Sequence, residues 1–339
     1  LVVSEYSKEL YKLERQYIDY ILTENQESDA IQQELSQVML KQCDDSQSKA
    51  METVELLQDL INPIDFSSNF LSDLANNTYD LSNDVTEIEI AQARDYVEKL
   101  LDVDLSQVKV LRLHQNVRNN SEGFCIACGN NDHHIFYQND ASGVISTDLI
   151  VHELGHAADF SISRNECNDS LVNKHISLSE AVAYYCQFSY LLEHGNKEQR
   201  VGSFGAFFFT YLAIVTCRIC IKSGVPLSDI DENDVANDDE CITILNSYNF
   251  DSKQFIVDKV REIKQMFSNI ESLIYHEVAP RFGLILGVFL LNKPQEFINK
   301  IIKSNSIDQS LESFVAEIIP NYHDSINDLE NKFEQYFGR

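Results

Sequence analysis

The chain contains one short pattern whose residue types and spacing predict a metal site, His152-Glu153-Leu154-Gly155-His156. On an α-helix, residues four positions apart lie one above the other on the same face. Two imidazoles at that spacing can bind one zinc ion, and the glutamate beside the first can activate a water molecule. Thr147 or Asp148 would be a suitable N-cap for such a helix. We therefore predict His152 and His156 as metal ligands and Glu153 as the catalytic base.

A catalytic zinc site needs a third protein ligand and keeps a fourth position open. A histidine six residues after the second one is excluded as this ligand, because Ile162 stands there. Glu180 is the best candidate, since its apolar surroundings in 177–185 make a carboxylate costly to bury without a partner. Alternatively, Glu180 forms a capping box with Ser177 at the start of a helix. Three weaker candidates for the third ligand are Glu166, Asp169 and His175.

The elements that must position these residues are mostly helices. Three segments before residue 102 repeat apolar residues at helical spacing: 6–21, 31–60 and 87–101. Three other segments have the short apolar, β-branched or aromatic pattern of strands: 108–113, 124–129 and 133–139. Residues from 148 onward are mostly helical in pattern. We therefore predict a mainly α fold with a small antiparallel β-sheet beside the helix that carries the two histidines.

Residues 123–185 resemble the zinc core of the oligoendopeptidase F and thimet oligopeptidase family. The resemblance rests on these features, in chain order: Gly123-Phe124-Cys125, a strand ending at Tyr137-Gln138-Asn139, Asp148, the HELGH segment at 152–156, and Glu180. Weaker similarity extends upstream through Tyr79-Asp80-Leu81 and 89–101. The resemblance implies a helical zinc-peptidase fold in which His152, His156 and Glu180 bind one Zn²⁺ ion.

The resemblance also implies how a substrate is held. In the family, the edge strand beside the zinc helix lines a peptide groove and pairs with an extended substrate backbone. By this similarity, the expected substrate-binding residues are Gly123, Phe124, Cys125, Ile126 and Ala127. A later helix of the family supplies a histidine and several tyrosines that stabilise the oxyanion. His276 matches this histidine. The positions at which the family has tyrosines are occupied here by Arg281, Ile285 and Val288. The hydrogen-bond donor to the oxyanion is then either Tyr275 or Arg281, or this chain has no such donor.

The N-terminal segment is predicted to be a separate helical arm. Residues 61–86 are rich in Asp, Asn and Ser, which is typical of a boundary between domains. We therefore expect a helical arm over 1–60 and a zinc peptidase-like catalytic domain over 61–339. In the family, a much longer N-terminal half forms one wall of a deep channel, so the resemblance implies a more open groove here.

The chain is strongly acidic, with 54 Asp and Glu residues, 26 Lys and Arg residues, and a net charge of −28. Phosphate binding needs clustered basic side chains, so nucleic acids and anionic membrane surfaces are unfavourable partners. A basic peptide or protein substrate would be attracted electrostatically. The longest uncharged run, 201–217, has 17 residues, and we interpret it as a buried core helix rather than a membrane span.

The eight cysteines are too few for a disulfide scaffold, which favours a reducing compartment such as the cytoplasm. The Cys125–Cys128 and Cys217–Cys220 pairs have the spacing of a four-cysteine zinc site. The second pair lies in an apolar helical stretch, so core packing is the better interpretation. His133 and His134 are expected to be structural residues of a strand near the site.

Together these patterns predict a zinc-dependent metalloendopeptidase that hydrolyses peptide bonds in peptides or in a protein substrate. Two alternatives stay open. The replaced tyrosines are compatible with a catalytically impaired, zinc-bearing module that binds a peptide or protein. The small size and acidic charge are compatible with a bacterial effector protease that is delivered into a host cell and cleaves one folded protein. The sequence makes no prediction of the oligomeric state.

Overall fold

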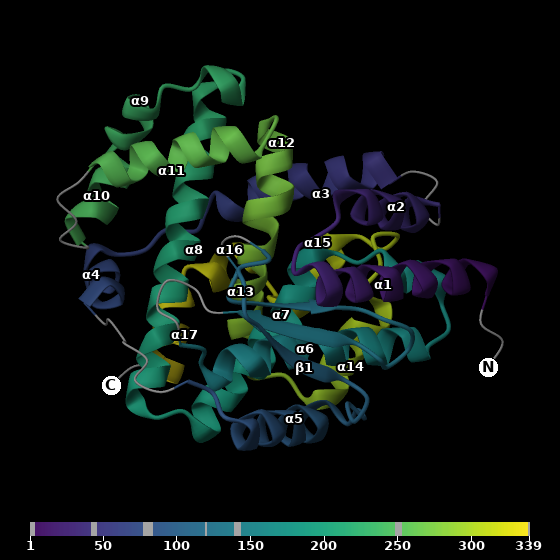
Figure 1. Ribbon diagram of the computed structural model, residues 1–339. Coiled ribbons are helices and arrows are strands. Elements are labelled where there is room, and N and C mark those ends of the chain that lie inside the picture. The colour runs from purple at the N-terminus through teal and green to yellow at the C-terminus, as the bar shows by residue number, and fades with distance from the viewer. Residues whose placement is uncertain are drawn as a thin grey trace.

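The computed structural model describes residues 4–41, 46–76, 84–118, 121–138, 144–247 and 253–337. The fold is mainly helical, as the sequence predicts (Figure 1). The helices before the sheet are α1 (Glu5–Glu24), α2 (Asp29–Leu40), α3 (Ser46–Ile61), α4 (Ser68–Asn76) and α5 (Glu87–Leu101). The periodic segment 31–60 is therefore divided between α2 and α3.

The strands form one three-stranded sheet in the described part of the chain, in the order β1-β3-β2. They are β1 (Lys109–Leu113), β2 (Gly123–Ile126) and β3 (His134–Gln138). The predicted hairpin is confirmed, because β2 and β3 pair antiparallel and Gly129 takes the positive φ that the turn requires. The sheet as a whole is mixed rather than antiparallel, since β1 pairs with β3 in parallel. An alternating pattern fixes the two faces of a strand but not the direction of its neighbour.

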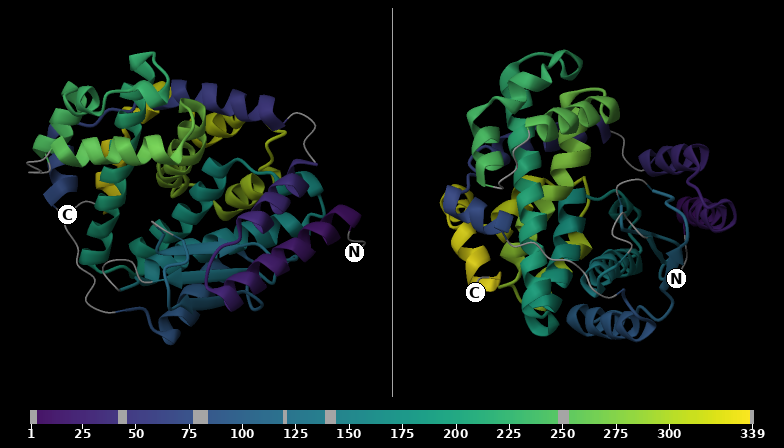
Figure 2. Two further views of the ribbon diagram at one scale, coloured as in Figure 1. Left: turned by 45° about the horizontal axis from the view of Figure 1, so that its top comes forward. Right: turned by 60° about the vertical axis from the view of Figure 1, so that its left-hand side comes forward.

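Two helices cover the sheet. Helix α1 packs on one face, where Tyr17, Ile18 and Ile21 join a buried cluster with side chains from all three strands. Helix α6 (Thr147–Asn165) contacts β2 and β3. Figure 1 shows α1 crossing in front of the strands, and in the right-hand view of Figure 2 the purple N-terminal helices lie on the outer side of the sheet. The helix with the two histidines is thus attached directly to the hairpin.

The N-cap of α6 is Ser146, whose hydroxyl accepts a hydrogen bond from the N–H of Leu149 at 3.4 Å. The prediction of Thr147 or Asp148 as the N-cap was therefore wrong by one or two residues. Ser, Thr and Asp are all favourable N-caps, so their neighbouring positions in the sequence do not distinguish them.

Helix α7 (Ile176–His194) packs against both α6 and α13 (Ala279–Leu290). Glycines make these contacts very close. A Cβ atom on Gly155 of α6 would lie 2.8 Å from Cα of Ala183, and one on Gly283 of α13 would lie 2.4 Å from Cβ of Glu180. Real Cβ atoms do not approach other atoms this closely, so a side chain at either position would force α7 to move.

The remaining elements surround this centre. They are η1 (Asp169–Val172), α8 (Lys197–Ser223), η2 (Leu227–Asp229), α9 (Glu232–Ala236), α10 (Asp239–Ser247), α11 (Lys253–Met266), α12 (Ile270–Leu273), the π-helical turn η3 (Ile274–Val278), α14 (Gln295–Ser304), α15 (Leu311–Ile318), α16 (Tyr322–Ile326) and α17 (Leu329–Phe337). Leu57 and Ile61 of α3 are buried in the same core cluster as residues of α6, α7 and α13. The domain boundary at residue 60 stays a prediction.

Two helical segments are long and apolar enough, by length and composition alone, to cross a membrane: Gly205–Ser223 and Ile270–Leu290. Their most apolar windows are 67% and 72% buried inside the protein. Core helices of globular proteins pass the same test, so these segments are weak evidence for a membrane. Phe207, Ile214 and Val215 in the uncharged run are buried, as its interpretation as a core helix requires.

Candidate metal centre

The three predicted ligands meet where α6 packs against α7. The Nε2 atom of His152 lies 3.4 Å from Oε2 of Glu180, and Nε2 of His156 lies 3.5 Å from Oε1 of Glu180. One ligand atom from each residue lies within 4.8 Å of the other two. Helices α6 and α7 thus form one candidate metal site, although Glu180 is 24 residues after His156 in the sequence.

The geometry of this cluster fits a metal ion. Zinc binds His nitrogen and carboxylate oxygen at about 2.1 Å, and the edges of a tetrahedron with such bonds are about 3.4 Å long. The two distances above have this length. The side chains of His152, His156 and Glu180 are 11%, 15% and 20% exposed, so the cluster is mostly shielded from water but still partly accessible. The cluster can therefore hold a metal ion.

The imidazole of His152 is held by a chain of side chains behind it. Its Nδ1 lies 3.2 Å from Oε1 of Gln187, and Nε2 of Gln187 donates to Oδ2 of Asp148 at 2.9 Å. When Nδ1 carries the proton and donates a hydrogen bond to Gln187, Nε2 is unprotonated. Its free electron pair then faces Glu180 and His156. Gln187 and Asp148 thus select the tautomer of His152 that can bind a metal.

Replacing Gln187 by leucine is expected to weaken metal binding by about 10- to 100-fold, because His152 loses the acceptor that fixes its orientation and tautomer. The measurement is competition with a chromophoric chelator. Gln254→Leu is the matched control, since Gln254 is exposed on α11. Equal affinities of the two variants would contradict a role of Gln187 in the site.

Glu153 lies beside the cluster without belonging to it. Its side chain is buried, and its Oε2 atom has no hydrogen-bond partner in the described part of the chain. Burial raises the pKa of the Glu153 carboxyl, and the charges of His152 and His156 oppose this effect. A buried carboxylate oxygen without a partner is costly to maintain, so this oxygen of Glu153 is available to a bound molecule.

Glu180 is held as a charged carboxylate by its neighbours. Burial would raise the pKa of the Glu180 carboxyl, but His156 and His152 outweigh this effect and lower it. The capping-box interpretation of Glu180 does not hold, because α7 begins at Ile176 with His175 as N-cap, and the Ser177 hydroxyl donates to the carbonyl of Ala279 at 2.7 Å. Ser177 therefore links α7 to the first residue of α13 and does not cap its own helix.

Sequence analysis missed Gln187 and Tyr184 as neighbours of the ligands. The Tyr184 ring lies edge-on to the imidazole of His152, with 4.6 Å between the ring centroids. Both residues follow Glu180 on α7 at positions i+4 and i+7, the spacing that places side chains on one helix face. This spacing could have identified Tyr184 and Gln187 from the sequence, but only if Glu180 were already known to face the histidines.

Strand β2 is one of the two edge strands of the sheet in the described part of the chain, and it lies directly against Glu153. A Cβ atom on Gly123 would be only 3.2 Å from Cγ of Glu153. The N–H of Gln138 donates to the carbonyl of Glu122, which fixes the alternation of hydrogen-bonded pairs between β2 and β3. By this alternation, the backbone N–H groups of Gly123 and Cys125 point away from β3, toward the outer edge. Burial raises the pKa of the Cys125 thiol, and the charge of Glu153 adds to this effect.

The three residues predicted from the later helix occupy different surroundings. Arg281 pairs with Glu277 at 2.9 Å, and its charge contributes to the low pKa of Glu180. Tyr275 and His276 lie in the π-helical turn η3, with their rings 5.1 Å apart. Burial alone lowers the pKa of His276. Of the three, Arg281 is thus the residue whose charge acts on Glu180. The role of each of the three in stabilising the oxyanion stays a prediction.

The weaker candidates for the third ligand have other partners. Glu166 pairs with Lys303 at 2.9 Å, and both Asp169 oxygens accept hydrogen bonds from serine hydroxyls of the α1 N-terminus. His175 lies 2.8 Å from the carbonyl of Gln309 through its Nε2 atom. Among the described residues, no cysteine belongs to a group able to hold a metal ion. The two cysteine pairs therefore do not form the alternative zinc site.

His134 is the first residue of β3, as expected, whereas His133 comes directly before the strand. The Nδ1 atom of His133 accepts a hydrogen bond from the N–H of Cys128 at 2.9 Å, which closes the turn between β2 and β3. Both imidazoles are buried. Asn139 and Tyr79-Asp80-Leu81, which contribute to the family resemblance, lie outside the described residues.

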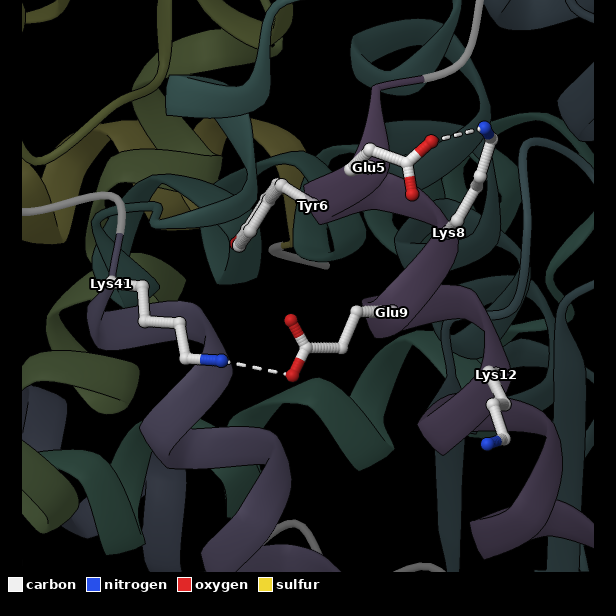
Figure 3. A pocket seen from close by; sticks show the side chains of 6 residues that line it. All are labelled: Glu5, Tyr6, Lys8, Glu9, Lys12 and Lys41. Atoms are coloured by element: carbon white, nitrogen blue, oxygen red, sulfur yellow. Dashed lines mark hydrogen bonds and ion pairs between the residues drawn. The ribbon is translucent and has the colours of Figure 1, made fainter.

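A separate hollow lies between α1 and α2 (Figure 3). Its charged side chains largely neutralise one another, since Glu5 pairs with Lys8 and Glu9 pairs with Lys41. None of the three metal-binding candidates lines it. The hollow is therefore not part of the candidate metal centre.

Comparison with known proteins adds no relative. No family model matches the chain, and neither a curated protein nor a solved structure shows significant similarity to it.

Proposed function

We propose that the chain is a zinc-dependent metallopeptidase. The observation that carries the proposal is the convergence of His152, His156 and Glu180 beside a buried carboxylate, Glu153, with one oxygen free of hydrogen bonds. Two neutral imidazoles and one carboxylate form a common ligand set for catalytic zinc, and a nearby glutamate is the base that such a site needs.

When bound, a zinc ion lowers the pKa of water to about 7 and polarises the carbonyl of the bond to be cleaved. Glu153 accepts the proton that water loses as oxygen bonds to the carbonyl carbon. It then delivers the proton to the amide nitrogen as the C–N bond breaks, so that a carboxylic acid and an amine leave. His152 and Glu180 keep their positions through Gln187 and through the close contact with Gly283.

The substrate backbone is proposed to lie along β2. The outward N–H groups of Gly123 and Cys125 can each donate to an extended peptide, as in β-strand addition. Phe124 and Ile126 face the α1 side of the sheet and hold the strand in place. Tyr275, His276 and Arg281 stay the candidates for the group that stabilises the oxyanion, and Arg281 is favoured because its charge acts on Glu180.

The test is digestion of a mixed peptide library with mass-spectrometric detection of products. We expect cleavage that stops when a chelator removes the metal and returns when zinc is added. If the zinc-loaded protein cleaves no peptide, the peptidase proposal fails for peptides. A pull-down with that protein would then separate a folded-protein substrate from a binding module without activity.

A further inference from the structure

A second cavity, of about 240 Å³, lies between the N-terminal helices and the sheet. Its walls come from elements that are far apart in the sequence: α1, α2, the end of β2, α6 and η1. Apolar groups line much of it, among them Leu10, Tyr17, Leu35, Met39, Phe160 and Val172. The cavity is large enough for one large side chain, since about eight water molecules would occupy the same volume in the liquid.

The cavity continues the candidate active site along two elements. On α6, Phe160 and Ser163 follow His156 at positions i+4 and i+7, so they lie on the same face as the metal ligand. Ser163 is about 10 Å from His156 along the helix axis, at 1.5 Å per residue. On β2, Ile126 is also about 10 Å from Gly123, which touches Glu153. Both elements therefore place the cavity about 10 Å from Glu153, the length of about three residues of an extended peptide.

The charged groups at the cavity are already paired. The buried guanidinium of Arg164 lies 2.5 Å from the buried carboxylate of Glu14. Lys174 pairs with Asp159 at 2.8 Å, and Arg118 pairs with Glu27 at 2.6 Å. A charged occupant would have to break one of these pairs or be buried without a counterion. An uncharged, apolar occupant avoids this cost.

We propose that this cavity is a specificity pocket, which binds a large apolar side chain of the peptide substrate about three residues from the cleaved bond. The inference rests on the proposed peptidase function. It also gives α1 and α2 a role, because these helices close the pocket on the side opposite α6.

The first test uses cleavage. The products of the peptide library should show a preference for Leu, Phe or Met at one position about three residues from the cleaved bond. In the variant Ala127→Leu, the added side chain enters the cavity, because Ala127 lines it. We expect Ala127→Leu to lower the ratio of kcat/KM for a peptide with Leu at that position to kcat/KM for the matching Ala peptide by about 10- to 100-fold. Ala91→Leu is the matched control on the exposed surface of α5.

The second test uses binding and does not need cleavage. The protein has no tryptophan, so a peptide with a single Trp at successive positions is its own fluorescent probe. With the zinc-loaded Glu153→Gln protein, we expect one position to give a blue-shifted emission that Ala127→Leu abolishes in the same background.

The two tests separate the two proposals. A blue shift without any hydrolysis by the wild type would contradict the peptidase and keep the pocket. Hydrolysis with no side-chain preference, a preference for a charged side chain, or no blue shift at any position would overturn the pocket alone.

Discussion

The variant Glu153→Gln is expected to lose about 10²- to 10⁴-fold in kcat/KM for a cleaved peptide. Glutamine has the shape of glutamate, but it can neither accept the proton from water nor return it to the leaving amine. Glu153 is not among the three candidate metal ligands, so under the proposed function the zinc content should not change. Initial rates and metal analysis of the same preparation measure both quantities.

Glu166→Gln is the control for this loss. Glu166 caps the same helix, is exposed, and pairs with Lys303 rather than with any residue of the site. Its variant should keep the rate of the wild type. Undiminished cleavage by Glu153→Gln would refute the assignment of Glu153 as the base, whatever the metal content.

The variant Gly283→Ala is expected to lower the free energy of unfolding by about 3 kcal/mol, because the new methyl group meets atoms that cannot move alone. Its Cβ would lie 2.4 Å from Cβ of Glu180 and 2.6 Å from the carbonyl oxygen of Ser177. Relief requires a shift of α7, which carries Glu180, so metal affinity should fall together with stability. Denaturant titration of the metal-free protein and chelator competition measure the two effects separately.

The same substitution at Gly205 gives the opposite expectation. Gly205 lies within α8, and beyond its chain neighbours and the backbone of its own helix no atom of the described residues lies within 4 Å of the position that its Cβ would take. Alanine is the better helix former, so Gly205→Ala should raise stability by about 0.5–1 kcal/mol. If both variants change stability by the same amount and sign, close helix packing is not the reason for glycine at 283.

The features that could be predicted from sequence depend on short-range geometry. The spacing of His152 and His156 on one helix needs only the helical repeat, and the structure places both imidazoles together with Glu180. The β2–β3 hairpin was predictable because its two strands are separated by a short Gly-Asn-Asn-Asp turn. Glu180 was identified by the cost of burying a carboxylate in an apolar helix, and the structure supplies its partners.

The features that could not be predicted depend on contacts between distant segments. The parallel pairing of β1 with β3 is set by the route of the chain, which the pattern of 108–113 does not encode. Gln187 is one of many polar residues on helices, and only the packing of α7 on α6 brings it to His152. The cavity walls come from five elements, so no local pattern could indicate it. The family resemblance itself stays a prediction.

The close packing of α6, α7 and α13 has a thermodynamic consequence for the metal. Since all three candidate ligands lie on α6 and α7, we expect folding of the chain itself to assemble the site. A zinc finger, in contrast, folds only when the ion binds. Here the ion would act by mass action on the native state and add RT ln(1 + [M]/Kd) to its stability, about 2.7 kcal/mol at a free concentration one hundred times Kd. Zinc availability would then tune the lifetime of this protein without deciding whether it folds.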